Sequence, residues 1–496
     1  MSDPVVHIGS GAVRGRRAAG LSVFKGIPYA RPPFGPHRFR APVEAEPWEG
    51  IREAAEFGSR APQVPIFPWD LPWTADEGLD CLTVNVWTPD PGGAGLPVMV
   101  WIHGGGYQFG SAGEPDYDAS LLAAAGVVAV TCNYRLGLDG FAHVAGAPPN
   151  RGLLDQAAAL RWVQDNIAAF GGDPGRVTIF GESAGGGSVA CLMAMPSAHG
   201  LFRRAIVQSA PRHVLSEGLA GRIAAALAHR LGTDPTVEGF SSRGIEDVLE
   251  EAGRLITEDP VGRQLDLQLG RIAFGPVVDG QVLPRAPWDA PTAGTGSDVE
   301  LIAGFNADEY RLFAIVLGTT RDMSDEELSH VARTLAPANA QDVCRQSMPG
   351  TTARDRDIRL LSDAMFRMPT ARLADTHQAG GGTTYAYELT WPAPGSDGTL
   401  GACHALDVPL TFGTFGAPLA AQLIGESPQA RAAAEELSRS IRTSWTAFAS
   451  TGDPGWPRYD ATTATTRVYN TEITDVNDPE ATSRRLWADH PFAPLL

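Results

Sequence analysis

A serine lies between two glycines in the segment Gly181-Glu182-Ser183-Ala184-Gly185. The short apolar stretch from Val177 to Phe180 precedes this segment, and further small residues follow it. The order predicts a strand, a sharp turn and a helix, the setting in which a G-x-S-x-G serine is a nucleophile. Side chains at the two glycine positions would collide with the adjacent strand and helix. The hydroxyl would lie exposed beside a helix N-terminus, whose free N–H groups favour an oxyanion.

A second glycine-rich segment, His103-Gly104-Gly105-Gly106, follows the apolar stretch that begins at Pro97. Consecutive glycines after a strand let two backbone N–H groups point toward the nucleophile. Acyl transfer needs such donors where negative charge develops, and losing one typically costs ~3 kcal/mol. We therefore predict part of an oxyanion hole here, with a flexible loop as the alternative. His103 is expected to be structural, because it precedes the nucleophile and ends the strand.

A nucleophilic serine of this kind needs an acid and then a histidine further along the chain. Five of the histidines after Ser183 do not fit this order. His199, His213 and His229 follow the serine too closely for an acid-bearing strand to lie between. His330 lies in a predicted helix, and His490 lies in the proline-containing tail. His377 and His404 remain. His404 is favoured, because its glycine-started loop follows the predicted strand Thr384 to Leu389, and catalytic side chains collect at such strand ends.

The acid should follow a strand between the serine and that histidine. The stretch from Leu301 to Ala303 is a predicted strand, and the turn after it contains Asp308 and Glu309. Because both are carboxylates, their chemistry does not choose between them. For either residue, the alternative is a structural carboxylate at a helix N-terminus.

The segments that must position these residues alternate between apolar strands and helices. The predicted strands are Leu21 to Phe24, Cys81 to Trp87, Pro97 to His103, Val127 to Asn133, Val177 to Phe180, Ala205 to Gln208, Leu301 to Ala303 and Thr384 to Leu389. Apolar residues at helical spacing predict helices over Leu153 to Phe170 and Ala430 to Ser450. This alternation predicts a large, mostly parallel central sheet flanked by helices, an α/β fold. Residues 1–496 are expected to form one domain, with helical insertions over the active site at about 212–270 and 324–374.

Composition excludes some function classes. With 43% hydrophobic residues, 496 residues can bury a large core, and the net charge of −18 argues against nucleic acid or anionic membranes as partners. The longest apolar run, Leu121 to Val130, is too short for a membrane span, which needs about 20 residues. The sequence contains neither HExxH nor a Walker A motif, and Gly9-Ser10-Gly11 lacks the rest of a dinucleotide fingerprint, so no metal or cofactor is expected.

The five cysteines have no paired short spacing, so neither a disulfide framework nor a zinc site is predicted. The N-terminal residues show no basic segment followed by an apolar stretch. We therefore expect a cytoplasmic protein, or a secreted one if a leader has been removed. The sequence does not indicate an oligomeric state.

The sequence resembles the type-B carboxylesterase and cholinesterase-like family, which includes bacterial carboxylesterases, over nearly its whole length. Besides the two glycine-rich segments, the resemblance rests on Phe24-Lys25-Gly26-Ile27-Pro28-Tyr29-Ala30, Asp80-Cys81-Leu82-Thr83-Val84-Asn85-Val86-Trp87-Thr88-Pro89, Asn133-Tyr134-Arg135, Gly152-Leu153-Leu154-Asp155-Gln156, Phe170-Gly171-Gly172-Asp173-Pro174, Val278-Asp279-Gly280, Leu283-Pro284 and Trp456-Pro457. It implies an α/β-hydrolase fold.

The resemblance also assigns roles to residues. The acid is the glutamate of the Asp-Glu pair, here Glu309, and the histidine of the Gly-x-x-His segment is His404. The implied oxyanion donors are the N–H groups of Gly105, Gly106 and Ala184. Glu182 matches a position that modulates charge in the pocket, and Arg135 with Asp155 matches a structural ion pair.

The sequence departs from the family pattern at several positions. Ala405-Leu406-Asp407 follows the histidine where Gly-x-Glu is usual, and Tyr310 follows the acid where glycine is usual. Leu79 replaces a common glutamate, so a salt bridge from that position to Arg38 is expected to be absent. No cysteine lies near Ala61 to pair with Cys81, which favours an intracellular location.

These features predict a serine carboxylesterase that cleaves small-molecule carboxylic esters through a Ser-His-Glu triad and an acyl-enzyme. The alternatives are an amidase, carbamate hydrolase or lactonase with the same machinery, and a non-catalytic binding protein on the same fold. Aromatic residues considered for the pocket are Trp69, Trp73, Tyr107, Phe274 and Phe313. Because no lipase-like apolar lid is present in the sequence, short acyl chains are expected to be preferred.

Overall fold

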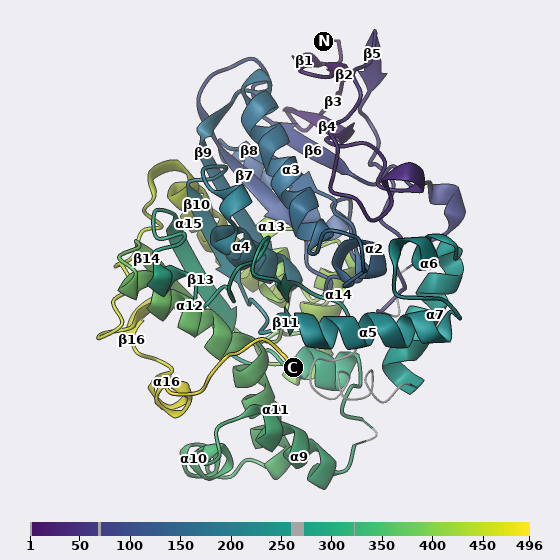
Figure 1. Cartoon of the computed structure of the whole chain (residues 1–496). Helices are drawn as coiled ribbons and strands as arrows, with labels where there is room; N and C mark the ends of the chain where they lie inside the picture. Colours follow the sequence, from purple (N-terminus) through teal and green to yellow (C-terminus); the bar gives the residue numbers. More distant parts are fainter. Residues whose placement is uncertain (1, 68–70, 259–271, 322) are drawn as a thin grey trace.

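The structure is a computed structural model that describes residues 2–67, 71–258, 272–321 and 323–496. An 11-stranded sheet runs through the molecule in the order β16-β15-β14-β13-β10-β9-β7-β8-β6-β4-β3 (Figure 1). The strands from β15 to β8 in this order are parallel to their neighbours, and antiparallel pairs occur at both edges. The predicted α/β-hydrolase fold with a mostly parallel centre is confirmed.

The bounds of the sheet strands follow the apolar stretches in the sequence. In chain order the strands are β3 (Arg16–Ala18), β4 (Leu21–Pro28), β6 (Thr83–Thr88), β7 (Leu96–Ile102), β8 (Val128–Cys132), β9 (Gly172–Glu182), β10 (Arg204–Gln208), β13 (Glu300–Asn306), β14 (Thr384–Leu389), β15 (Thr465–Tyr469) and β16 (Thr474–Asn477). Two smaller sheets contain β1 (Val5–Ile8), β2 (Gly11–Arg14) and β5 (Ile51–Glu53), and β11 (Leu215–Ser216) with β12 (Val277–Val278).

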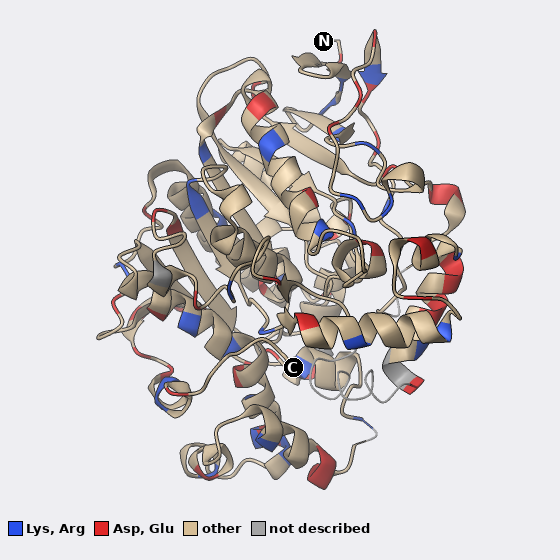
Figure 2. Cartoon of the chain, viewed as in Figure 1, with Lys and Arg blue, Asp and Glu red and all other residues tan. Residues whose placement is uncertain are grey.

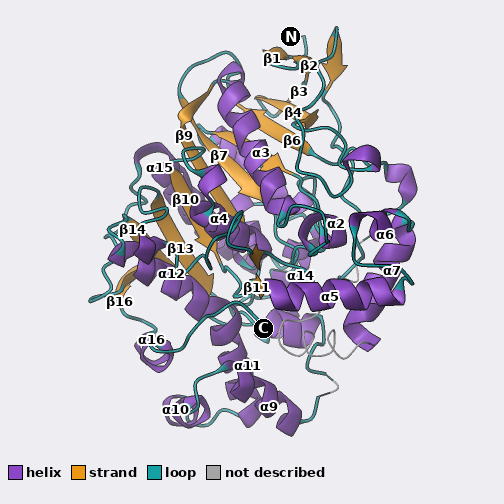
Figure 3. Cartoon of the chain, viewed as in Figure 1, coloured by secondary structure: helices purple, strands orange, loops and turns teal. Residues whose placement is uncertain are grey.

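Helices cover both faces of the large sheet (Figure 3). Residues of α3 (Arg151–Asn166), α4 (Ala184–Ala194) and α12 (Met368–Ala379) belong to one apolar core. Residues of α1 (Ser120–Ala124), α13 (Asp407–Phe412) and α15 (Pro428–Thr451) belong to the other. Within β7, Val98, Val100 and Ile102 join the first core, whereas Met99 and Trp101 join the second. This alternation is the period of two that places successive strand residues on opposite faces.

The remaining helices lie mostly toward the periphery, where Figure 2 shows many of the charged residues. They are α2 (Gly137–Phe141), α5 (Glu217–Arg230), α6 (Val237–Ser241), α7 (Ile245–Glu258), α9 (Asp325–Leu335), α10 (Ala340–Ser347), α11 (Ala353–Ser362), α14 (Pro418–Leu423) and α16 (Ala481–Trp487). No helix among the described residues is both long enough and apolar enough to cross a bilayer.

The two expected insertions correspond to helical blocks, α5 to α7 and α9 to α12. The first block was expected to reach residue 270, and its last part lies outside the described residues. In the second block, α9 to α11 lie beyond the end of the sheet, whereas α12 packs on the sheet with β13 and β14 (Figure 1). We therefore propose one domain over 1–496 whose second insertion ends before α12.

Candidate active site

Ser183 occupies the sharp turn between β9 and α4. Its backbone angles are φ 56° and ψ −126°, outside the regions that residues with side chains usually adopt. A Cβ at Gly181 would lie 2.6 Å from the carbonyl carbon of Gly185, and one at Gly185 would lie 2.0 Å from the carbonyl oxygen of Ile102. These contacts confirm the steric reason for glycine on either side of the serine.

His404 and Glu309 come together at the carboxyl ends of β13 and β14. The Nδ1 atom of His404 lies 2.5 Å from Oε2 of Glu309, a carboxylate that is fully buried. The other carboxylate oxygen accepts hydrogen bonds from the Ser209 hydroxyl at 2.6 Å and from the Asn306 backbone N–H at 2.8 Å. Because Glu309 is held by these donors, it can keep the imidazole in one orientation.

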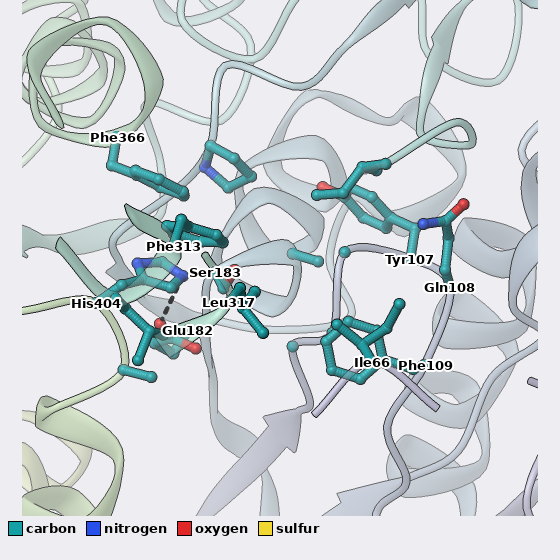
Figure 4. A pocket seen from close by; sticks show the side chains of 18 of the residues that line it. Ile66, Tyr107, Gln108, Phe109, Glu182, Ser183, Phe313, Leu317, Phe366 and His404 are labelled. Atoms are coloured by element: carbon teal, nitrogen blue, oxygen red, sulfur yellow. Dashed lines mark ion pairs between the residues drawn. The ribbon is translucent and has the colours of Figure 1, made fainter. Parts of the chain in front are cut away.

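The other ring nitrogen of His404 faces Glu182. Its Nε2 atom lies 3.1 Å from Glu182 Oε1, and Ser183 lies beside both residues in the same pocket (Figure 4). Burial raises the pKa of Glu182 well above the usual value for a glutamate. Burial alone would lower the pKa of His404, but the carboxylates of Glu182 and Glu309 outweigh it and raise that pKa to about 9. The pocket therefore stabilises a positively charged imidazole.

The structure separates the two alternatives that the residues alone left open. His377 is buried elsewhere, with its ring nitrogens at 2.8 Å from the Thr384 hydroxyl oxygen and 3.2 Å from the Gly296 carbonyl oxygen. Asp308 accepts a hydrogen bond from the Ala402 backbone N–H at 3.1 Å and is partly exposed. Neither residue lines the pocket that contains Ser183.

The glycine-rich loop after β7 lies against the serine, since a Cβ at Gly104 would lie 3.3 Å from Cβ of Ser183. Gly105 and Gly106 have φ of 105° and 57°, and a Cβ at Gly105 would lie 2.0 Å from the Phe109 carbonyl oxygen. Both glycines line the pocket together with Ala184. Within the described part of the chain, none of these three backbone N–H groups donates a hydrogen bond. Unpaired amides next to a nucleophile are what an oxyanion site requires.

The rest of the pocket is mainly apolar. Its aromatic lining residues are Phe67, Tyr107, Phe109, Tyr117, Tyr310, Phe313 and Phe366. Of the aromatics considered from the sequence, Tyr107 and Phe313 line it. Trp73 and Phe274 are buried outside it, and Trp69 lies outside the described residues. For Trp73 and Phe274 the alternative of internal packing holds, because the sequence does not show which face of a helix or loop lines a cavity.

A second buried carboxylate supports the histidine loop from behind. Asp407 accepts hydrogen bonds from Gln208 Nε2 at 2.8 Å and from the Tyr387 hydroxyl at 3.0 Å through one oxygen. Its other oxygen accepts from Asn306 Nδ2 at 3.2 Å, and that amide also donates to the Cys403 carbonyl at 2.8 Å. Burial raises the pKa of Asp407. The network ties the histidine loop to the ends of β10, β13 and β14.

The sequence reasoning missed Ser209 and Phe366. Ser209 directly follows a predicted strand, the same signal that located Glu309, so its position could have been inferred. The Phe366 ring lies 4.3 Å from the His404 ring between centroids, and it stacks on Phe313. Its place follows from the path of the helical block after α11, which no local pattern shows.

Residues interpreted as scaffold are buried or paired. The pair of Arg135 with Asp155 is confirmed, with 2.6 Å between Nη2 and Oδ1. His103 is buried, and burial lowers its pKa to about 4. With leucine at position 79, Arg38 is paired with Asp139 instead, at 2.8 Å.

Cys81 is free, as expected from the missing partner near Ala61, and so are Cys132, Cys191, Cys344 and Cys403. No group of three or more His, Cys, Asp or Glu residues in the described ranges could hold a metal ion.

This fold, with a serine at the turn between the parallel strand β9 and the helix α4, defines an α/β-hydrolase. A model of the carboxylesterase family matches residues 2–486. The chain is 36% identical to the para-nitrobenzyl esterase of Bacillus subtilis (strain 168), with 98% of each chain covered. It is 34% identical to the phenmedipham hydrolase of Pseudarthrobacter oxydans (96% and 97% covered) and to the liver carboxylesterase of Sus scrofa (92% and 88%).

Solved structures agree with these matches. A PNB esterase structure superposes with a TM-score of 0.83 at 35% identity, covering 98% of this chain and 99% of the other. A carboxylesterase of Geobacillus stearothermophilus gives a TM-score of 0.84 at 34% identity, with 97% and 99% covered. The chain therefore belongs to the carboxylesterase family, and it is a serine hydrolase of carboxylic esters.

Proposed function

We propose that Ser183, His404 and Glu309 form the catalytic triad with which this enzyme hydrolyses small-molecule esters. Ser183 Oγ attacks the ester carbonyl carbon while His404 Nε2 accepts its proton. Glu309 orients the ring and stabilises the imidazolium. His404 then protonates the leaving alcohol, and water cleaves the acyl-enzyme by the reverse proton transfers. The contact of 2.5 Å between His404 Nδ1 and the buried Glu309 is the observation that carries this proposal.

The N–H groups of Gly105, Gly106 and Ala184 bind the oxyanion of the tetrahedral intermediate in this mechanism. These N–H groups have no acceptor among the described residues, which supports this role. The oxyanion can accept their hydrogen bonds without breaking an existing one. Each such donor contributes on the order of 3 kcal/mol to transition-state stabilisation.

Glu182 adjusts the charge of the histidine. At 3.1 Å from His404 Nε2 it stabilises the imidazolium that forms during acylation, but it also competes with Ser183 for the same nitrogen. Glu182 therefore favours the charged intermediate state and disfavours the neutral base that begins the reaction.

The substrates are uncharged, largely apolar esters. The pocket is lined mainly by aromatic and aliphatic side chains, and Glu182 and His404 are the ionisable pair beside Ser183. A cytoplasmic location is part of the same proposal and is supported by five free thiols.

A fluorophosphonate probe tests the nucleophile, since it forms a bond only with an activated hydroxyl. We expect Ser183 to be the labelled residue and Ser183→Ala to lose the label and at least ~10³ of kcat, because a triad acts as a unit. Ser188→Ala is the matched control, since Ser188 is a buried serine of the same helix. Labelling at another residue, or a Ser183→Ala enzyme with most of its turnover, would refute the proposal.

A further inference from the structure

His213 is a buried side chain that the mechanism does not use. Its exposed fraction is 1%, yet it lines the pocket that contains Ser183. Neither ring nitrogen has a hydrogen bond of normal geometry within the described ranges, and the Phe274 backbone interacts with the ring only as a weak acceptor. A buried polar side chain without a well-formed hydrogen bond destabilises the fold, so such groups usually have a structural or functional reason.

The position of the His213 ring is fixed by its surroundings. The backbone N–H of Arg212 donates to the Met365 carbonyl at 2.8 Å, and that of Leu215 donates to the Pro276 carbonyl at 2.8 Å. A Cβ at Gly275 would lie 2.2 Å from Cδ2 of the ring, so glycine is required for the ring to lie there. The imidazole is therefore held at the pocket wall before any ligand binds.

The Tyr107 hydroxyl is a second polar group at the same wall. The centroids of the Tyr107 and His213 rings are 6.1 Å apart. A Cβ at Gly187 would lie 2.4 Å from the Tyr107 hydroxyl oxygen, so this hydroxyl packs over the first turn of α4, which begins after the nucleophile. Tyr107 lines the same pocket as Ser183 and His213.

The roles proposed for Ser183 and His404 place this wall on the acyl side of the site. The leaving alcohol must face His404, because His404 protonates it, so the acyl chain extends to the other side of Ser183. Figure 4 shows Tyr107 across the pocket from His404, with its hydroxyl end turned toward the cavity.

Both groups are uncharged at neutral pH. Burial lowers the pKa of His213 to about 3, an effect that the backbone of Phe274 offsets only in part. Burial raises the pKa of Tyr107. A neutral imidazole has one donor and one acceptor nitrogen, and a phenol both donates and accepts, so the pair matches a ligand group with the same two capacities.

We propose that His213 and Tyr107 form a polar subsite that binds a hydroxyl group carried by the acyl chain of the ester. The inference rests on the proposed function, since it places the acyl chain by the roles of Ser183 and His404. It deepens that function by making hydroxyacyl esters a preferred substrate class in a pocket that is otherwise mainly apolar.

The test compares p-nitrophenyl butyrate with the p-nitrophenyl esters of 2- and 3-hydroxybutyric acid, each as single enantiomers. The readout is the ratio of kcat/KM for the best hydroxy ester to that for butyrate. This ratio is compared between each variant and the natural enzyme. Because the same esters are used throughout, differences in their intrinsic reactivity cancel. We expect His213→Leu and Tyr107→Phe each to lower this ratio about threefold to tenfold, mainly through KM, because each removes one uncharged hydrogen bond.

His213→Gln is the conservative variant, because its side-chain amide keeps one donor and one acceptor. We expect it to retain more of the ratio than His213→Leu, an outcome that a purely structural role would not produce. An unchanged ratio in both His213→Leu and Tyr107→Phe would overturn the subsite. If His213→Leu does not fold, an unchanged ratio in Tyr107→Phe overturns it. An enzyme that cleaves none of the esters would instead contradict the proposed function.

Discussion

The wall behind His404 and the wall around His213 differ in how their polar groups are used. Behind His404, both oxygens of Glu309 and both oxygens of Asp407 accept hydrogen bonds from protein donors. Around His213, neither imidazole nitrogen has a hydrogen bond of normal geometry among the described residues, and Tyr107 lines the pocket beside it. A polar group that is committed to a network holds its neighbours in place, whereas an uncommitted one is available to a ligand. On the proposed roles, the groups behind His404 orient the base, and the groups around His213 select the substrate.

The largest effect is expected at Glu309, the buried carboxylate that is hydrogen-bonded to His404. Glu309→Gln removes the charge that orients and stabilises the imidazolium, so we expect kcat to fall by on the order of 10³. Steady-state kinetics on p-nitrophenyl butyrate measures this change, and KM should change much less.

Asp308→Asn is the matched control for that variant, since it alters the adjacent carboxylate, which is partly exposed and outside the pocket. We expect its kcat to stay within about threefold of the natural enzyme, as is usual for substitutions away from the site. An equal loss of activity in Asp308→Asn and Glu309→Gln would contradict the specific role given to Glu309.

A smaller effect is expected at Glu182, which lies 3.1 Å from Nε2 of His404. The Glu182 carboxylate helps to raise the pKa of His404 to about 9, so Glu182→Gln should lower that pKa. Because the neutral imidazole is the base, the acid limb of the kcat/KM–pH profile should move to lower pH. At the optimum we expect a loss of about tenfold, since the imidazolium is less well stabilised.

The exposed Glu44 provides a control, and Glu44→Gln should leave the profile where it is. An acid limb that stays in place in Glu182→Gln would show that Glu182 does not set the protonation of His404.

The smallest effect concerns the apolar side chains that line the pocket on the side of His213. A short acyl chain is buried in the pocket, whereas the far methylenes of a long chain reach solvent and gain no further burial. Among p-nitrophenyl esters of rising chain length we therefore expect turnover to be severalfold higher for butyrate than for dodecanoate. Faster hydrolysis of the dodecanoate would mean that the pocket binds a longer acyl chain than its lining side chains indicate.

Local patterns predicted much of the fold. The apolar stretches became strands β7, β8, β9, β10, β13 and β14 within a few residues of their expected bounds, because valine-rich runs between helices are the signature of buried parallel strands. The strand β9 begins earlier than expected, at Gly172, since it pairs there with the start of β7 across a register shift. The packing of α12 on the sheet was not predictable, because its helical spacing is the same whether it packs on the sheet or lies beyond it.

The sequence by itself determined the turn that presents Ser183, the proposed nucleophile, since that turn depends on glycines only a few residues away. Residue chemistry could not choose between Asp308 and Glu309 or decide fully between His404 and His377, and the resemblance to a family made those choices. Only the tertiary structure showed that Glu309 is buried against His404, that Ser209 supports it, and that His213 faces the same pocket. The physical reason is distance along the chain: a turn is set by its own neighbours, whereas hydrogen bonds between residues about 100 positions apart depend on how the sheet brings the strand ends together.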